Sequence, residues 1–141
     1  MKGKVIIITG ASSGIGESCA FEFSKLGAKL MLVARSEKKL IEISDKINLN
    51  GGDSTFFVTD VSVEEECNEM VRKTISYFGQ IDILINNAGI SMRSIFNELK
   101  LSVFERVMKV NFLGAVYCTK YALPYILKRK GSVVGVSSIA G

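Results

Sequence analysis

Five short apolar segments recur along the chain, and glycine or polar residues follow each one at once. They are KVIIIT (4–9), KLMLVA (29–34), TFFVT (55–59), DILIN (82–86) and SVVGVS (132–137). Most of them are continuously apolar rather than alternating, which is typical of strands covered on both faces of a parallel sheet. The pattern therefore predicts five buried strands.

Apolar residues at helical spacing occupy the segments between these strands. The predicted stripes are Ile15, Cys19, Phe23 and Leu26, then Leu40, Ile43 and Ile47, then Cys67, Met70, Val71, Thr74, Ile75 and Phe78. Capping boxes at 62–65 and 102–105, each a serine with glutamate three residues on, mark two helix starts. The second box should open a long helix that runs from Ser102 to about Lys130, with a kink at Pro124.

Strands and helices thus alternate from one end of the sequence to the other. This order predicts an α/β fold, a doubly wound, Rossmann-type parallel sheet of five strands with helices on both faces. No linker and no internal repeat interrupts the 141 residues, so residues 1–141 should form a single domain.

Composition narrows the range of functions. The chain has no histidine, and its three cysteines lack the spacing of metal ligands, so we expect no zinc site. Scattered cysteines of this kind favour reduced core thiols and a cytoplasmic protein. The net charge is +4, and the dense basic run 128–130 falls at a predicted helix end, where it complements the helix dipole; we expect no nucleic-acid partner. We expect no signal peptide and no transmembrane segment.

The stretch TGASSGIG follows the first predicted strand and contains the first candidate chemistry. Its glycines, Gly10, Gly14 and Gly16, are spaced neither as G-x-G-x-x-G nor as a P-loop. They still allow a tight turn, and a helix that begins near Ser13 offers free N–H groups to a phosphate. An ordinary strand-to-helix turn is the alternative, but three glycines with Ser12 and Ser13 favour an anion-binding loop.

Charged residues follow the second and third strands. Arg35 stands where dinucleotide folds accommodate a 2′-phosphate, and no acidic residue occupies 33–35. A surface arginine near a helix start is the alternative. Asp60, followed by Val61, either accepts a hydrogen bond from an adenine amino group or serves as a turn residue before the Ser62 cap, and both roles remain open.

Amides and hydroxyls follow the remaining strands. NNAG (86–89) places two asparagines after a buried strand, where a plain turn would need only one. Asn111 lies inside the predicted fourth helix among apolar neighbours, which is an unfavourable position for an amide and suggests a functional role. The alternative is that Asn111 only packs between helices. Ser137 and Ser138 follow the fifth strand.

In this order TGASSGIG, NNAG, the VN pair at 110–111 and VSSIAG resemble the motifs of the short-chain dehydrogenase/reductase family. The resemblance implies an oxidoreductase that transfers hydride between NADP(H) and a carbonyl or alcohol substrate. It implies NADP(H) in preference to NAD(H), because Arg35 looks like the basic residue of NADP-preferring members. Ala34 occupies the place where NAD-preferring members carry aspartate. Family members are commonly homodimers or homotetramers, which we expect here.

The resemblance also implies roles residue by residue. The pyrophosphate and the adenosine side would lie against Gly10, Ser12, Ser13, Gly14, Ile15 and Gly16. The adenine would contact Asp60 and Val61, and the nicotinamide-side ribose would lie along Asn87, Ala88 and Gly89, with Asn86 supporting the sheet. The catalytic residues would be Asn111, whose backbone carbonyl would hold a water in a proton relay, and Ser138, which would orient the substrate, with Ser137 the second choice.

One motif of the family is not found in the 141 residues. Its Tyr-x-x-x-Lys pair lies beyond the serine motif, and no such spacing occurs earlier in the chain. We therefore expect an incomplete domain, without the later strands and the substrate loop, that is inactive alone. The alternative is a non-catalytic dinucleotide-binding or scaffold protein. A serine hydrolase is disfavoured, because Ile139 replaces the glycine of a nucleophile elbow and no histidine is available as a base.

Overall fold

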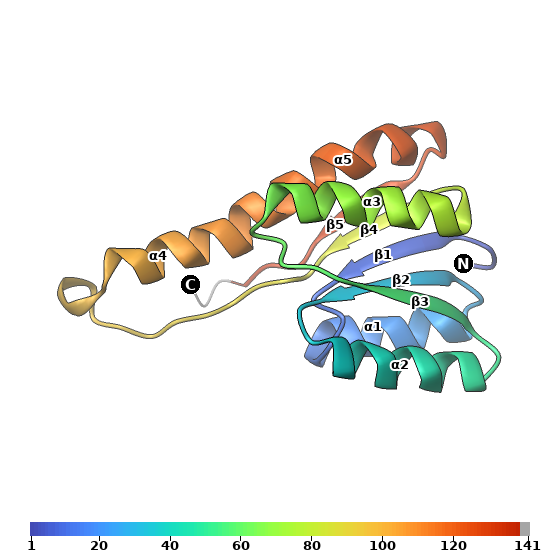
Figure 1. Ribbon diagram of the computed structural model, residues 1–141, viewed down its shortest axis with the longest axis horizontal. Coiled ribbons are helices and arrows are strands. Elements are labelled where there is room, and N and C mark those ends of the chain that lie inside the picture. Colours follow the sequence, from blue (N-terminus) through green and yellow to red (C-terminus); the bar gives the residue numbers. More distant parts are fainter. Residues whose placement is uncertain (139–141) are drawn as a thin grey trace.

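The computed structural model describes residues 1–138, in which parallel strands form one sheet between two layers of helices (Figure 1). The sheet has five strands in the order β3-β2-β1-β4-β5, and all adjacent pairs are parallel. The strands are β1 (Val5–Thr9), β2 (Lys29–Ala34), β3 (Asp53–Val58), β4 (Ile83–Asn86) and β5 (Ser132–Gly135). The predicted doubly wound fold is confirmed.

Helices cover both faces of the sheet. Figure 1 shows α1 (Gly14–Lys25) and α2 (Glu37–Leu49) on one face, and α3 (Glu64–Phe78) and α5 (Gly114–Lys128) on the other. Between β4 and α5 the chain projects away from the sheet as an arm, residues 90–108, which contains a short 3₁₀ turn (Phe96–Glu98) and α4 (Leu101–Met108). A π-helical turn (Lys109–Leu113) joins α4 to α5.

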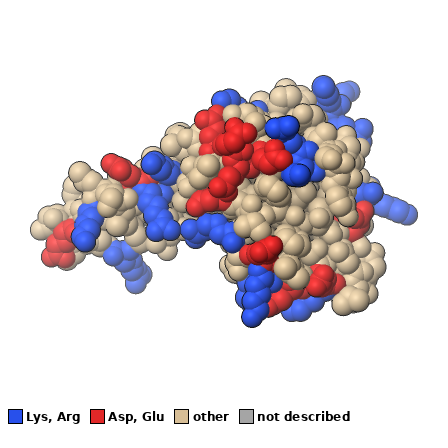
Figure 2. Space-filling view, in the orientation of Figure 1, with Lys and Arg blue, Asp and Glu red and all other residues tan. Residues whose placement is uncertain are grey.

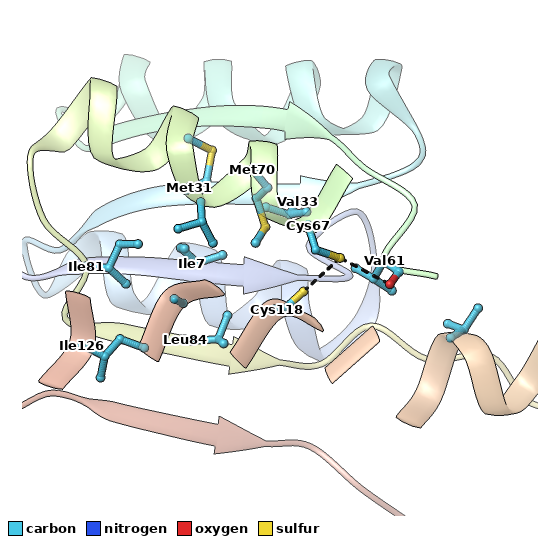
Figure 3. Close-up of a cluster of buried hydrophobic side chains, with 13 residues drawn as sticks. Ile7, Met31, Val33, Val61, Cys67, Met70, Ile81, Leu84, Cys118 and Ile126 are labelled. Carbon is cyan, nitrogen blue, oxygen red and sulfur yellow. Dashed lines mark hydrogen bonds between the residues drawn. The ribbon is translucent and has the colours of Figure 1, made fainter. Parts of the chain in front are cut away.

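The core lies in two layers, one on each side of the sheet. Ile7, Met31 and Leu84 point toward α3 and α5, and this layer is drawn in Figure 3. Ile6 and Leu30 belong to the opposite layer, with the buried side chains of α1 and α2. Adjacent residues of the central strands are therefore buried on opposite faces, which explains why these segments are continuously apolar.

The fifth strand differs from the prediction, because it is exposed rather than buried. Val133 and Val134 of β5 keep 41% and 43% of their surface in contact with solvent. β5 lies at the edge of the sheet, and within residues 1–138 its only strand partner is β4. An apolar segment is buried only where neighbouring elements cover it on every side, and β5 has a described strand neighbour on one side only.

The predicted stripe on α1 is only partly correct. Cys19 and Phe23 pack partly buried against the core, but Ile15 and Leu26 are 59% and 56% exposed. Both exposed residues lie at the ends of the helix, Ile15 in its first turn and Leu26 at its C-cap. The ends of α1 extend past the region where the sheet covers its apolar face.

Neither predicted capping box forms. The N-cap residue of α3 is Val63, and the Ser62 hydroxyl donates instead to Asp60 Oδ1 at 2.7 Å. The helix predicted to start at Ser102 begins at Leu101, with Lys100 as its N-cap. In the first case, the carboxylate two residues earlier is the stronger acceptor within reach of the serine.

The predicted fourth helix is interrupted. At the π-helical turn the Gly114 N–H bonds to the carbonyl of Lys109, five residues back, and α5 then continues through Pro124. A Cβ on Gly114 would lie 2.8 Å from Val61 Cγ2, so this glycine lets the helix backbone approach the loop after β3.

Within residues 1–138 no helix has the length and apolar character needed to cross a membrane.

Charges of both signs are interspersed on the surface in view in Figure 2, with acidic side chains gathered over the first turn of α3. Within this turn Glu64 accepts hydrogen bonds from Lys120 Nζ at 2.8 Å and from the Tyr121 hydroxyl at 2.7 Å. The acidic turn is thereby tied to α5, which fixes the two helices of this face side by side.

Candidate functional site

A cavity of about 400 Å³ opens at the carboxyl edge of the sheet, where β1, β2, β3 and β4 end. Parallel α/β sheets bind their ligands at this edge. The predicted site residues that line the cavity are Gly10, Ser12, Ser13, Ile15, Arg35, Asp60, Val61, Asn87, Ala88 and Gly89. Residues that lie far apart in the sequence therefore meet around one cavity.

The remaining predicted residues lie outside the cavity lining, and other residues join it. Those outside the lining are Gly14, Gly16, Asn111 and Ser138, whereas Ala34, Ser36, Thr59, Ile90 and Val110 belong to it. Each of these five is a sequence neighbour of a predicted residue. Ala34 and Val110 were already named in the sequence analysis, the first for its place at the end of the second strand and the second in the VN pair. Ser36, Thr59 and Ile90 had no signal beyond their position next to a predicted residue.

The glycine loop brings the start of α1 close to the NNAG segment. Gly10 and Gly14 have φ angles of +66° and +57°, which side chains with a Cβ rarely adopt. A Cβ on Gly16 would collide with the Gly10 carbonyl and would lie 2.6 Å from Asn87 Nδ2. Gly16 thus acts through close packing rather than by lining the cavity.

Thr9, which the sequence analysis did not single out, joins the ends of β1 and β4. Its hydroxyl donates to the Ile85 carbonyl at 3.2 Å and accepts from the N–H groups of Asn87 and Ala88 at 3.0 Å each. Asn87 Nδ2 completes the connection by donating to the carbonyls of Thr9 at 3.0 Å and Gly10 at 3.3 Å. These bonds fix the NNAG backbone against the glycine loop.

Hydrogen-bond donors and positive charge gather at the glycine-loop end of the cavity. The N-cap residue of α1 is Ser13, and the first amides of a helix have no partner within it. The hydroxyls of Ser12 and Ser13 and the guanidinium of Arg35 belong to residues of the same cavity. Amides, hydroxyls and a guanidinium together are suited to phosphate groups.

Asp60 supplies an acceptor to the same cavity and also forms a turn. Its Oδ1 accepts from the Ser62 N–H at 3.0 Å and from the Ser62 hydroxyl. Burial alone would raise the pKa of Asp60, but the Ser62 bonds and the charges of Arg35 and Arg106 outweigh it and lower that pKa. The predicted turn role is formed, and the carboxylate is ionised beside the cavity.

Asn111 holds the segment that follows NNAG. Its Nδ2 donates to the Ile90 carbonyl at 2.9 Å, and its Oδ1 accepts from the Ile90 N–H at 2.9 Å. A Cβ on Gly89 would lie 3.6 Å from the same Oδ1. The side chain of Asn111 therefore positions the wall of the cavity without lining it.

The remaining predicted amide and serines lie near β5. Asn86 Nδ2 donates to Thr119 Oγ1 at 3.0 Å, and this bond ties β4 to α5. The Val136 N–H donates to the Asn86 carbonyl at 2.9 Å, so the segment after β5 runs beside NNAG. Ser137 and Ser138 follow in this segment and are exposed.

Comparison with known proteins gives one family and closely similar folds. The family described as short chain dehydrogenase matches residues 4–141. The 11-beta-hydroxysteroid dehydrogenase-like 4A of Arabidopsis thaliana is 43% identical over all of this chain and 48% of its own length. The 11-beta-hydroxysteroid dehydrogenase A of Sesamum indicum is 44% identical over 96% of this chain and 40% of its own length.

Among solved structures, an alcohol dehydrogenase from the archaeon Thermococcus sibiricus, complexed with 5-hydroxy-NADP, superposes with a TM-score of 0.93. The two sequences are 32% identical. The match covers 96% of this chain and 58% of the archaeal enzyme. The chain thus spans about half the length of the curated relatives that it matches.

Proposed function

Because the chain belongs to the short chain dehydrogenase family, which its residues 4–141 match, we propose that it provides the dinucleotide-binding part of an oxidoreductase. The enzyme transfers hydride between NADP(H) and an alcohol or carbonyl substrate. The observation that carries the proposal is that Ser12, Ser13, Arg35, Asp60 and residues 87–89 line one cavity.

The donor set fits each part of NADP(H). The helix amides and the hydroxyls of Ser12 and Ser13 suit the pyrophosphate, and the ionised Asp60 suits an exocyclic amine as a hydrogen-bond acceptor. The small residues Ala88 and Gly89 leave room for a ring at the other end of the cavity.

The preference for NADP(H) rests on the residues that end β2. Ala34 offers no carboxylate to a ribose diol, and the Arg35 guanidinium suits a 2′-phosphate. The Thermococcus sibiricus neighbour, complexed with 5-hydroxy-NADP, supports the same choice. The relatives are named dehydrogenases, and the solved neighbour is an alcohol dehydrogenase, which supports an alcohol or carbonyl substrate.

When bound, the cofactor supplies the hydride, and the protein orients the reactants. Ser138 would donate its hydroxyl to the substrate oxygen, where charge develops during the reaction. Asn111 would keep Gly89 and Ile90 rigid, so that the cavity wall stays fixed. The 141 residues contain no Tyr-x-x-x-Lys, so we propose that this chain alone binds the dinucleotide without turnover.

A titration of the purified chain with NADPH and NADH tests the proposal. We expect NADPH to bind about tenfold or more tightly than NADH, since a charge-assisted hydrogen bond to the 2′-phosphate contributes about 1.5–3 kcal/mol. Replacing Ala34→Asp together with Arg35→Val should reverse this preference. Lys38→Ala, which removes an exposed cation of the α2 first turn outside the cavity lining, is the control and should preserve it.

Equal affinities for the two cofactors in the unaltered chain would contradict the preference, and no binding of either would contradict the proposed function. Incubation with NADPH and a panel of aldehydes and ketones tests the proposed lack of turnover, which any NADPH oxidation by this chain alone would contradict. Binding without NADPH oxidation also fits the alternative of a non-catalytic dinucleotide-binding protein. Turnover by these 141 residues would eliminate that alternative.

A further inference from the structure

Two of the three cysteines face each other in the core between α3 and α5 (Figure 3). The Sγ atoms of Cys67 and Cys118 lie 3.6 Å apart, and both residues are at most 1% exposed. A disulfide requires a sulfur–sulfur distance of about 2.05 Å, so closure brings the two sulfurs about 1.5 Å closer and draws on the packing between α3 and α5. The third cysteine, Cys19, packs on the opposite side of the sheet and cannot compete for either partner within one chain.

We propose that Cys67 and Cys118 form a redox-sensitive dithiol, which peroxide closes to an intramolecular disulfide, and that closure loosens the Val61 wall of the dinucleotide cavity. The dithiol itself is independent of the proposed function. Only its effect on cofactor affinity rests on that function.

The pair has a defined nucleophile. The hydrogen bond from the Cys118 thiol lowers the pKa of Cys67, and the same bond, together with burial, raises the pKa of Cys118. The Cys67 thiolate attacks one peroxide oxygen, the O–O bond breaks, and the departing hydroxide takes up a proton to leave as water. The resulting sulfenic acid is attacked by the Cys118 sulfur, which forms the disulfide and releases a second water.

A small cavity lies beside the Cys118 thiol. Cys118 and Gly114 line a space of about 10 Å³, roughly the size that holds one water molecule. Val61 and Ala88 line both this space and the large cavity. Val61 and Ala88 therefore form a shared wall between the large cavity and the space beside the Cys118 sulfur.

Closure of the disulfide changes the loop after β3. In the reduced protein the Cys67 thiol donates to the Val61 carbonyl at 3.4 Å, and a disulfide sulfur has no hydrogen to donate. Val61 is also packed against the backbone at Gly114, so movement between α3 and α5 acts on it directly. Val61 and its neighbour Asp60 line the large cavity, which connects the redox state to the site.

The test compares the reduced chain before and after treatment with hydrogen peroxide. We expect the intact mass to fall by two hydrogen atoms, peptide mapping to give a Cys67–Cys118 cross-link, and dithiothreitol to reverse both. Amide hydrogen exchange at Val61 and Val63 should be faster in the oxidised chain. Cys67→Ala and Cys118→Ala should abolish the cross-link, and Cys19→Ala, the control from the opposite layer, should retain it.

Oxidation confined to Cys19, with the other two thiols intact, would overturn the proposal. A cross-link that leaves amide exchange at Val61 and Val63 unchanged would overturn the proposed effect of the disulfide on the Val61 wall of the cavity. NADPH affinity should fall about fivefold on oxidation, the effect of about one net hydrogen bond. If neither form binds NADPH, the proposed function fails, while the mass and exchange measurements still decide whether the dithiol exists.

Discussion

The side-chain amide of Asn111 pairs with both backbone groups of Ile90, donating to its carbonyl and accepting from its N–H, each at 2.9 Å. This pairing joins the π-helical turn to the segment that follows NNAG. Single π turns inside helices are frequent at functional sites. Because the amide is engaged with Ile90, any direct part of Asn111 in catalysis belongs to its backbone, as the family resemblance implies.

Removing this amide should loosen the cavity wall. In Asn111→Ala both bonds to Ile90 are lost, and since Asn111 is itself exposed, we expect a modest loss of about 1 kcal/mol in unfolding free energy. Amide exchange at Ile90 should become faster, and NADPH affinity should fall about fivefold. Asn97→Ala, which removes an exposed asparagine from the arm at residues 90–108, serves as the control. An unchanged exchange rate at Ile90 in the Asn111 variant would contradict the positioning role.

A second prediction concerns the contact between α1 and the NNAG segment. Gly16→Ala places a methyl group against the Gly10 carbonyl and Asn87 Nδ2, so the start of α1 has to move. We expect a loss of about 1–3 kcal/mol in unfolding free energy, measured by urea denaturation, together with weaker NADPH binding. Gly135→Ala is the control, because a Cβ there meets no atom within 4 Å. Equal midpoints for the two variants would contradict the close-packing role.

The central fold was predictable from the sequence because continuous apolar segments are buried on both faces wherever helices flank the sheet. β1 and β2 follow this rule, with Ile6 and Ile7 buried on opposite sides. The same reasoning failed for β5, since exposure depends on which neighbours are present, and a segment does not encode that locally. The π turn was missed for a related reason: the approach of Gly114 to Val61 is a tertiary contact.

The site was predictable to the extent that strand ends identify it. Parallel strands finish at one edge, so Gly10, Arg35, Asp60, Asn86 and Ser138 were expected to meet there. The first three line one cavity, whereas Asn86 and Ser138 lie outside its lining. Thr9 was not predicted, because a threonine at a strand end is common. Only its three hydrogen bonds show that it joins the ends of β1 and β4. The capping box at 62–65 does not form because α3 begins after Val63 and the Ser62 hydroxyl donates to Asp60, and the box at 102–105 does not form because α4 already begins at Leu101.

A third prediction concerns the amino ends of the strands, on the side of the sheet away from the cavity. Asp82 is buried there, with 1% of its side chain exposed. Its carboxylate accepts from Lys4 Nζ at 3.0 Å, from the Val5 N–H at 2.9 Å and from Gln80 Nε2 at 2.7 Å. Burial alone would raise the pKa of Asp82, but these hydrogen bonds outweigh it and lower that pKa below 3.8, its usual value. The carboxylate therefore stabilises the fold only while it is ionised.

A group with a lowered native pKa adds stability above its unfolded pKa and loses it as the pH falls through the native value. The difference in unfolding free energy between the unaltered chain and Asp82→Asn should thus be constant above pH 5, at about 2 kcal/mol, and shrink below pH 3.8. Urea denaturation across this pH range measures it. Asp53→Asn, which breaks the exposed pair with Lys29, should cost little at any pH. A difference that grows as the pH falls would contradict the assignment.

The last prediction concerns the exposed edge of β5. Its residues Val133 and Val134 are 41% and 43% exposed, and an apolar edge strand with unpaired backbone groups is a template for pairing with another chain. We expect the purified 141-residue chain to self-associate in a concentration-dependent way through β5. A lysine on an edge strand opposes such pairing, so Val134→Lys should shift the chain toward monomer.

Val58→Lys is the matched control, because Val58 ends β3 at the other edge of the sheet and is 40% exposed. Light scattering coupled to size-exclusion chromatography, over a range of protein concentrations, measures both variants and the unaltered chain. Selective loss of association in Val134→Lys locates the contact at β5, since both changes add the same charge to a similarly exposed valine. A monodisperse monomer that melts cooperatively, already in the unaltered chain, would show that this edge is protected and would refute the prediction.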